Sequence, residues 1–252
     1  MTKTPKEYIS AEGSMNYELE LTKKQFNFNN WLYSKMIPYL KGDILETGSG
    51  CGTFSERLIR DFKGKIYLTE IDPLFLKQLK KNYEDKRVHI AKLDLNNKKD
   101  FSKIKTRFDS IFSSNVLEHI KDDILALKLL GTLLKPEGRI VLLVPCHKFL
   151  FSDIDIEEGH YRRYTKKELR EKAKKAGFEI KKEFWFDMIA VPARYISGNL
   201  LKIKKTPAGS LGLFNRLIHL IAFIEDKILR NSLGVSRIIV IEKNQEDFKK
   251  HL

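Results

Sequence analysis

The sequence predicts an α/β fold built around a parallel β-sheet. From residue 42 onward, short runs rich in Ile, Leu and Val alternate with longer stretches of helical period, which is typical of βαβ units. The chain has 252 residues, 42% of them hydrophobic, which suffices for the core of one domain and excludes a disordered or fibrous protein. A glycine-rich turn between the first predicted strand and the next helix is typical of α/β folds that bind nucleotide cofactors.

Seven apolar runs are predicted strands, at 43–47, 65–71, 87–93, 108–114, 139–145, 179–186 and 236–243. Helices are expected near 53–62, 73–83 and 121–134. The last should end in the segment Lys135 to Gly138, where proline cannot extend a helix and glycine permits a tight turn. A loop of about fifteen residues is expected after Pro145. Thr165 and Glu168 then form a capping box for a helix that should end at Gly177.

Two segments are expected outside the core, which we place at residues 42–187, with the last strand and a tail at 236–252. Residues 1–41 form a helical preface with aromatic side chains at positions 26, 28, 31 and 33. Residues 188–235 form a helical insertion, whose apolar residues at helical spacing are Leu217, Ile221, Ile224 and Ile228. An insertion of this length between sheet neighbours usually carries a function.

The charge is strongly basic, with a formal net value of +14. Ten Lys or Arg residues lie between His160 and Lys182, and clustered cations attract the phosphates of nucleic acids or of a membrane surface. Glu168 and Glu171 lie within the same run, so an ordinary solvated helix surface is the alternative.

Cysteine content and hydropathy indicate a cytoplasmic protein. Cys51 and Cys146 cannot form a disulfide framework, and we expect both to pack as small side chains. The first residues lack the apolar stretch of a secretion signal. The most apolar run, Leu211 to Ile224, is shorter than the roughly 20 residues that a membrane-spanning helix needs.

Polar residues at the ends of four predicted strands form a candidate cofactor site. The first strand runs into Glu46-Thr47-Gly48-Ser49-Gly50-Cys51-Gly52, and Thr53 breaks the spacing of the dinucleotide fingerprint. A carboxylate at Glu46 suits a cofactor with an ammonium and a sulfonium group better than it suits a pyrophosphate. The next three strands end in Glu70-Ile71-Asp72, in Asp94, and in the segment 113–119. Ligands of open α/β sheets bind at such strand ends.

These motifs resemble the class I S-adenosylmethionine-dependent methyltransferases. DILETGSGCGTFS, LTEID, KLD, FDSIFSSNVLEHI and LLKPEGRIVLLVP match that family in order and residue type over about residues 42–186. The resemblance implies a Rossmann-like seven-stranded sheet with one antiparallel strand, helices on both faces, and S-adenosylmethionine as cofactor. It implies cofactor contacts from Glu46, Gly48, Ser49, Gly50, Gly52, Glu70, Ile71, Asp94, Leu95, Ser113 and Asn115. The family more often has other residues at Thr47, Glu70 and Glu137.

The acceptor is expected to be a small molecule, methylated on oxygen or nitrogen. The chain lacks the N/D-P-P-Y/F tetrapeptide that goes with adenine amino groups and glutamine amides, and SSNVLEHI resembles small-molecule enzymes. The segment from Pro145 to Leu169 is similar to a subgroup found with bacterial surface-polysaccharide pathways, which points to a saccharide or lipid-linked saccharide. The alternatives are an RNA methyltransferase that uses the basic helix at 166–175 and a non-catalytic cofactor-binding partner protein.

His119 and His160 are the candidate catalytic residues. Our hypothesis is that His119 deprotonates an acceptor hydroxyl, and the alternative is that it shapes the pocket or caps a helix. His147 is a third candidate base, and we place it with the substrate-binding residues. The Glu118-His119 pair lacks a third metal ligand at fixed spacing, so no metal site is expected.

His147, Tyr161, Arg162 and Arg163 are the candidate substrate-binding residues. Two arginines beside aromatic residues suit a phosphate or carboxylate on the acceptor. The alternative is that both arginines pair with the acidic residues at 153, 155, 157 and 158 and fix the loop. For the insertion, we expect a lid that also touches the inner membrane surface, and the alternative is an amphipathic helix that packs on the sheet or on a second subunit.

Overall fold

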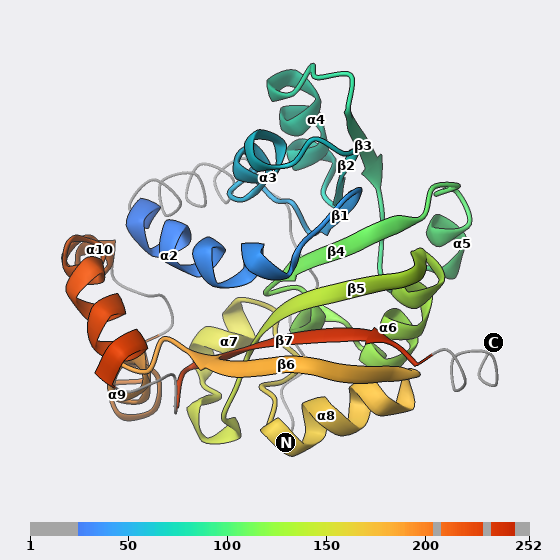
Figure 1. Ribbon diagram of the computed structural model, residues 1–252. Helices are drawn as coiled ribbons and strands as arrows, with labels where there is room; N and C mark the ends of the chain where they lie inside the picture. Colours follow the sequence, from blue (N-terminus) through green and yellow to red (C-terminus); the bar gives the residue numbers. More distant parts are fainter. Residues whose placement is uncertain (1–24, 204–207, 229–232, 245–252) are drawn as a thin grey trace.

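The computed structural model describes residues 25–203, 208–228 and 233–244, and its centre is one seven-stranded sheet (Figure 1). The strands are β1 Ile44–Thr47, β2 Ile66–Glu70, β3 Val88–Lys92, β4 Phe108–Ser114, β5 Leu134–Pro145, β6 Phe178–Phe186 and β7 Ser236–Lys243. Their order is β3-β2-β1-β4-β5-β7-β6, and β7 alone is antiparallel to its neighbours. The expected Rossmann-like topology is therefore confirmed.

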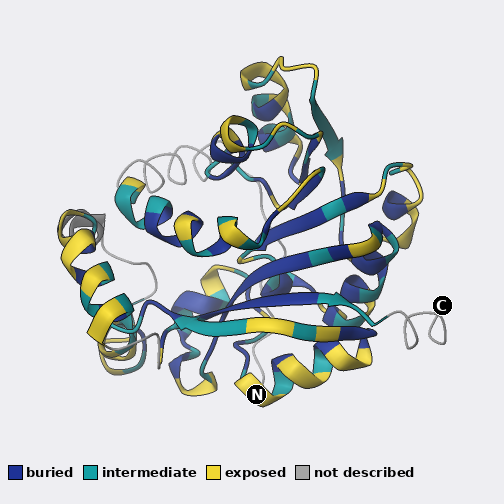
Figure 2. Ribbon diagram, in the orientation of Figure 1, coloured by how far each residue is buried: buried dark blue, intermediate teal, exposed yellow. Residues whose placement is uncertain are grey.

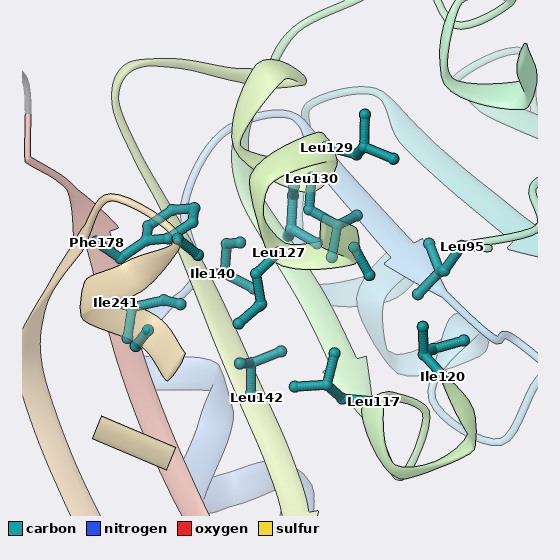
Figure 3. Close-up of a cluster of buried hydrophobic side chains, with 14 of the residues drawn as sticks. Leu95, Leu117, Ile120, Leu127, Leu129, Leu130, Ile140, Leu142, Phe178 and Ile241 are labelled. Carbon is teal, nitrogen blue, oxygen red and sulfur yellow. The ribbon is translucent and has the colours of Figure 1, made fainter. Parts of the chain in front are cut away.

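Helices cover both faces of the sheet. They are α2 Phe26–Met36, α3 Ser55–Asp61, α4 Pro73–Asn82, α5 Lys98–Phe101, α6 Asp123–Thr132, α7 Asp153–Glu157, α8 Lys166–Lys175, α9 Ala190–Tyr195 and α10 Ala208–Phe223. One buried cluster joins α2, α3, α4 and α10 to the sheet, and a second joins α5, α6 and α8 to its other face (Figure 3). Two apolar layers thus enclose the strands, as expected for a sheet of mostly parallel strands.

The register of the parallel strands brings their carboxyl ends to one edge. Thr47, the last residue of β1, lies opposite Thr69 of β2 and Ser113 of β4. The residues that follow these strands therefore share one edge of the sheet. The predicted site residues depend on this alignment.

The region around residues 132–138 differs from its prediction. Helix α6 ends at Thr132, and the segment from Leu134 to Gly138 is already part of β5. Leu134 pairs with Phe108 before a shift in register brings Arg139 opposite Ser110. A Cβ on Gly138 would lie 2.9 Å from the Phe108 carbonyl oxygen, so glycine is required by close strand approach as well as by the turn.

The segment after Pro145 is more ordered than the expected loop. It contains a 3₁₀ turn, η3 Lys148–Leu150, and the short helix α7. A capping box of Ser152 and Asp155 starts α7. The predicted capping box of Thr165 and Glu168 is present at the start of α8.

The described part of the insertion is helical, and only some of the apolar residues noted at helical spacing are buried. Ile218 and Ile221 are buried, whereas Leu217 and Ile228 are 46% and 64% exposed. Helix α10 packs against α2 (Figure 1), and Figure 2 shows exposed residues along its outer face. Because apolar residues lie on both faces of this segment, their spacing alone does not identify the packed face.

Buried polar contacts hold the insertion to the core. The Glu225 carboxylate, in the π-helical turn η5 Ile224–Ile228, accepts hydrogen bonds from the amides of Asp187 and Met188 at 2.6 and 2.7 Å. The Phe28 amide of α2 donates to the Asn215 side chain at 3.0 Å. The insertion is therefore tied to the end of β6 and to the N-terminal helix.

Candidate active site

The glycine-rich turn after β1 has backbone angles that favour glycine. Gly48, Gly50 and Gly52 have φ angles of +62°, +51° and +89°. A Cβ on Gly48 would lie 2.6 Å from Val116. One on Gly52 would lie 2.7 Å from the Tyr83 hydroxyl, whereas one on Gly50 would meet no described atom within 4 Å. The turn is packed on its flanks and open at Gly50, where a ligand can approach the backbone.

Glu70 holds the open part of the turn. Its carboxylate accepts hydrogen bonds from the amides of Gly50 at 2.8 Å, Ile71 at 2.7 Å and Asp72 at 3.1 Å. A carboxylate offers about four acceptor positions, so one remains for a ligand hydroxyl. Glu70, the residue predicted to bind the ribose, therefore lies at the end of β2 and also fixes the glycine turn.

Glu46 is a buried carboxylate just before the turn. Its side chain is 2% exposed, and the Ser55 hydroxyl donates to its Oε2 at 2.5 Å. Burial raises the pKa of Glu46 to about 7, although the hydroxyls of Ser55 and Ser49 favour the charged form. A cation bound at this carboxylate would offset the cost of its desolvation.

The other predicted cofactor residues follow the same edge of the sheet. Ile71 is exposed after β2, and Asp94 accepts a hydrogen bond from the Asn96 amide at 2.8 Å after β3. Leu95 is buried beside it, as are Ser49 in the turn and Ser113 in β4. Asn115 is exposed and has a φ angle of +52°. The fold thus brings the predicted cofactor residues together along one edge.

A group of three ionisable side chains lies beside the turn. Glu118 and His119 belong to the 3₁₀ turn η2 Leu117–His119, which precedes α6. The Tyr161 amide donates to the Glu118 carbonyl at 2.9 Å, which brings His160 from the loop after α7 to the same place. The contact between Gly48 and Val116 positions η2 next to the glycine turn.

The environment of this group shifts each of its pKa values. Burial raises the pKa of Glu118 to about 7, although His160, whose Nε2 lies 3.9 Å from Glu118 Oε1, favours the charged form. Burial and the neighbouring His160 lower the pKa of His119 to about 4. Burial would lower the pKa of His160, but Asp155 and Glu118 raise it above its usual value.

Asp155 is the buried anchor of the loop that carries His160. Its Oδ1 lies 2.9 Å from His160 Nδ1 and 2.7 Å from Arg163 Nε. Burial would raise the pKa of Asp155, but the contacts with His160 and Arg163 lower it to about 2. From its sequence, Asp155 is predicted only as a partner for the arginines, although the Ser152-x-x-Asp155 spacing signals its position at the start of a helix.

The two predicted substrate arginines are engaged within the protein. Arg163 is 4% exposed and pairs with Asp155, as the loop-fixing alternative expects. Arg162 pairs with a different acid, Asp123, at 2.5 Å, and its guanidinium lies over the exposed ring of Tyr161. The geometry supports a structural role for Arg163 and leaves Tyr161 accessible.

His147 lies apart from the ionisable group. Its ring stacks on Trp185 at a centroid distance of 4.7 Å, and its backbone has a φ angle of +66°. Burial lowers its pKa. The Phe149 ring also contacts His147, at a centroid distance of 5.2 Å, and the centroid of the Tyr195 ring is 6.3 Å from that of Phe149. These rings form an aromatic surface near the end of β5.

The basic helix α8 does not lie beside the glycine turn. It packs on β6, the edge strand, and β4, β5 and β7 separate β6 from β1. Lys172 pairs with Asp123 at 2.7 Å, and Arg170 pairs with Glu183. The feature that would favour an RNA acceptor, a lysine patch next to the cofactor site, is not found in the described residues.

Comparison with known proteins identifies the family of the chain. A family model described as a methyltransferase domain matches residues 24–183, which is more than half of the chain. No curated protein matches.

Three solved structures illustrate the likeness of the fold. A S-adenosylmethionine-dependent methyltransferase from Archaeoglobus fulgidus is 19% identical, with a TM-score of 0.60 over 90% of this chain and 99% of that chain. One from Mesorhizobium loti is 13% identical, with a TM-score of 0.58 over 84% and 96%. Phosphoethanolamine N-methyltransferase 2 from Haemonchus contortus is 18% identical, with a TM-score of 0.57 over 87% and 53%.

Proposed function

This chain belongs to the S-adenosylmethionine-dependent methyltransferases, and we propose that it methylates an oxygen or nitrogen of a saccharide or lipid-linked saccharide. The observation that carries the proposal is the buried Glu46 beside the open face of Gly50, with Glu118, His119 and His160 next to this turn. The bound cofactor supplies a methyl group made electrophilic by its positive sulfur. The protein has to hold the acceptor in line with that group and exclude water.

The residues at the strand ends fit this cofactor. Glu46 would accept its ammonium group, which supplies the cation that the buried carboxylate lacks. Glu70 would accept a ribose hydroxyl with its remaining lone-pair position. Asp94 and Leu95 would contact the adenine, one with a carboxylate and the other with an apolar surface.

The acceptor would face the group formed by Glu118, His119 and His160. An acceptor hydroxyl has to lose a proton, and a general base works best when its pKa lies near the working pH. His119, with a pKa of about 4, is neutral but a weak base, which favours the pocket-shaping alternative. The base hypothesis is tested with H119A: normal cofactor binding with most of the turnover retained would eliminate it.

Aromatic side chains support a saccharide acceptor. Tyr161, Phe149 and Tyr195 are 43%, 55% and 42% exposed, and they lie on the segments that follow β5 and β6. Exposed rings beside charged groups provide a flat apolar surface for the C–H face of a sugar, with hydrogen-bonding partners at its rim.

The outer surface of the insertion supports contact with a membrane. Its large exposed apolar residues include Leu200, Leu201, Leu217, Leu220, Phe223 and Ile228. The basic residues Lys202, Arg216 and Lys227 are exposed on the same segment. Apolar side chains flanked by cations suit an anionic bilayer surface. None of the described helices is long and apolar enough to span a membrane.

The membrane contact is tested with vesicles of zwitterionic lipid and of mixed anionic lipid at low salt. The full-length protein should sediment with the anionic vesicles, and binding should fall as salt screens the charges. The double variant L220S/F223S should bind at least about tenfold more weakly, since it loses exposed apolar area. The matched control is L125S, an equally polar change at an exposed leucine of α6. Equal binding of both variants, or none by the wild type, would reject the membrane contact.

The acceptor class is tested by supplying methyl-labelled S-adenosylmethionine and cell extract to the purified protein. Label in a nuclease-resistant fraction that partitions with lipids or small saccharides is the expected result. Nuclease-sensitive label would move the assignment to RNA. Cofactor binding without any label would favour the non-catalytic alternative. E46Q serves as the control, because it should lose cofactor binding while keeping the fold.

A further inference from the structure

Glu118, His119 and His160 resemble a set of metal ligands more than a set of acid and base groups. Each offers one donor atom, and the three atoms lie within 4.8 Å of one another. Sequence spacing indicated no third ligand for the Glu118-His119 pair, but the loop after α7 brings His160 to it. Two imidazoles and one carboxylate form a donor set that suits divalent first-row transition metals.

Glu118 has the environment of a ligand without its ion. The side chain is fully buried, and no other described residue donates a hydrogen bond to either carboxylate oxygen. Two other buried acids nearby have closer partners: Asp155 pairs with Arg163, and Asp123 with Lys172 and Tyr164. The one ion-pair contact of Glu118 is the 3.9 Å approach of His160 Nε2, so its carboxylate stays costly to bury, and a bound cation would reduce that cost.

His160 is held in the orientation that a metal ligand requires. Its Nδ1 lies 2.9 Å from Asp155 Oδ1, which directs Nε2 toward Glu118. A histidine whose second nitrogen is held by a carboxylate is the usual arrangement around protein-bound metals. The ring centroids of His119 and His160 are 4.7 Å apart, so the two imidazoles lie together beside Glu118.

We propose that Glu118, His119 and His160 bind one divalent transition-metal ion beside the glycine turn. Ligand atoms around such an ion lie roughly 3.4 Å apart, so the 3.9 Å between Glu118 Oε1 and His160 Nε2 needs a shift of about 0.5 Å. Glu158, whose Oε2 is 3.6 Å from the same nitrogen, lies on the exposed side and also contacts Arg194. In this proposal, the coordination position of the ion on that exposed side would be filled by water or by the acceptor.

The role of the ion rests on the proposed function. An acceptor hydroxyl bound to the ion would lose its proton more easily, because a divalent cation lowers the pKa of a coordinated oxygen acid. The proton would pass to solvent at the exposed side of the site. The oxygen would use the electron pair that it keeps to form the O–CH₃ bond, while the S–CH₃ bond of the cofactor breaks and its electron pair stays on the sulfur of the product S-adenosylhomocysteine.

Binding is measured on the full-length protein after chelator treatment, by titration with Co²⁺ and its visible absorption. We expect one Co²⁺ per chain, displaced by Zn²⁺. E118Q and H160N should each weaken binding at least about 100-fold, and D155N about 10- to 100-fold because it only orients His160. H89N is the matched control. His89 lies in β3, the edge strand next to β2, and packs on Tyr67 of β2.

Circular dichroism and cofactor binding show whether each variant is folded. If H160N unfolds, E118Q still decides the question, because it replaces a buried carboxylate with a neutral group of the same shape. No stoichiometric Co²⁺ binding, or equal binding by E118Q and H89N, would overturn the proposal.

Measuring methyl transfer with and without the metal distinguishes the existence of the metal site from its role in the reaction. Transfer that falls at least tenfold after chelation and returns with the metal supports both. Full transfer by chelated protein overturns the role of the ion and leaves the methyltransferase proposal intact. Stoichiometric metal binding without transfer to any fraction keeps the site and rejects the acceptor proposal.

Discussion

Replacing Glu46 by glutamine should stabilise the cofactor-free protein while weakening cofactor binding. Burial raises the pKa of Glu46 from its ordinary value of 4.5 to about 7. Between these two values the folded protein holds a proton that the unfolded chain has released. The wild type therefore loses stability as the pH rises from 4.5 to 7, and above pH 7 the full cost of the buried charge is present.

The magnitude follows from the two pKa values. The difference of about 2.5, at about 1.4 kcal/mol for each pH unit, corresponds to about 3 kcal/mol. Glutamine has no charge to bury, and its carbonyl oxygen can still accept the hydrogen bond from Ser55. The free energy of unfolding of E46Q minus that of the wild type should rise by about 3 kcal/mol between pH 4.5 and 8.

Urea unfolding without cofactor, followed by circular dichroism at several pH values, measures this difference. The matched control is E56Q, the same change at an exposed residue of α3, for which the difference should stay constant with pH. If the E46Q and wild-type stabilities change in parallel with pH, the buried charge of Glu46 is not the cause and the reasoning fails.

Cofactor affinity should change with pH in the opposite direction to the stability of the cofactor-free protein. An ammonium group needs the ionised carboxylate, so wild-type affinity for S-adenosylmethionine should fall up to about tenfold per pH unit below pH 7. E46Q should bind at least about tenfold more weakly at pH 8 and lose this pH dependence. Isothermal titration calorimetry on both proteins measures it, and tight binding by E46Q would remove Glu46 from the cofactor site.

Three further changes test the packing around the site. Y164F removes the buried hydrogen bond of 2.9 Å to Asp123 and should lower the free energy of unfolding, measured with urea, by about 1–2 kcal/mol. An unchanged urea midpoint would contradict this expectation. G138A places a Cβ 2.9 Å from the Phe108 carbonyl oxygen, so thermal unfolding should show a loss of about 1–3 kcal/mol, whereas a gain would mean that the strands can separate. R163Q removes the guanidinium that pairs with buried Asp155 and leaves His160 beside that carboxylate. It should cost about 3 kcal/mol, measured against R162Q, whose more exposed pair should cost less.

The sheet and its cofactor edge could be predicted from the sequence because both depend on local patterns. Apolar runs of strand length, a glycine-rich turn and Thr165 with Glu168 each report a structure within a few neighbouring residues. Parallel strands then align their carboxyl ends, so Glu46, Glu70 and Asp94 come to one edge without knowledge of any individual contact.

The packed face of the insertion and the partners of the arginines could not be predicted in this way. Leu217 and Ile221 are equally apolar, and only the position of α2 and the sheet decides that Ile221 is buried. Arg162 pairs with Asp123, 39 positions earlier in the chain, and no spacing rule connects the two. Ser55, which holds Glu46, carries no sequence signal of that contact.

By itself, the sequence determined the alternation of strands and helices, the turn that needs glycine, and the acids at the strand ends, because these depend on chain-local propensity and periodicity. The tertiary structure decided which charges are buried and which groups meet. Glu118 becomes a fully buried carboxylate, and His160 reaches it across 41 intervening residues, only because α7 and the Asp155 anchor fold that loop back over η2. Burial and long-range contact depend on how elements pack, and packing is a property of the whole fold.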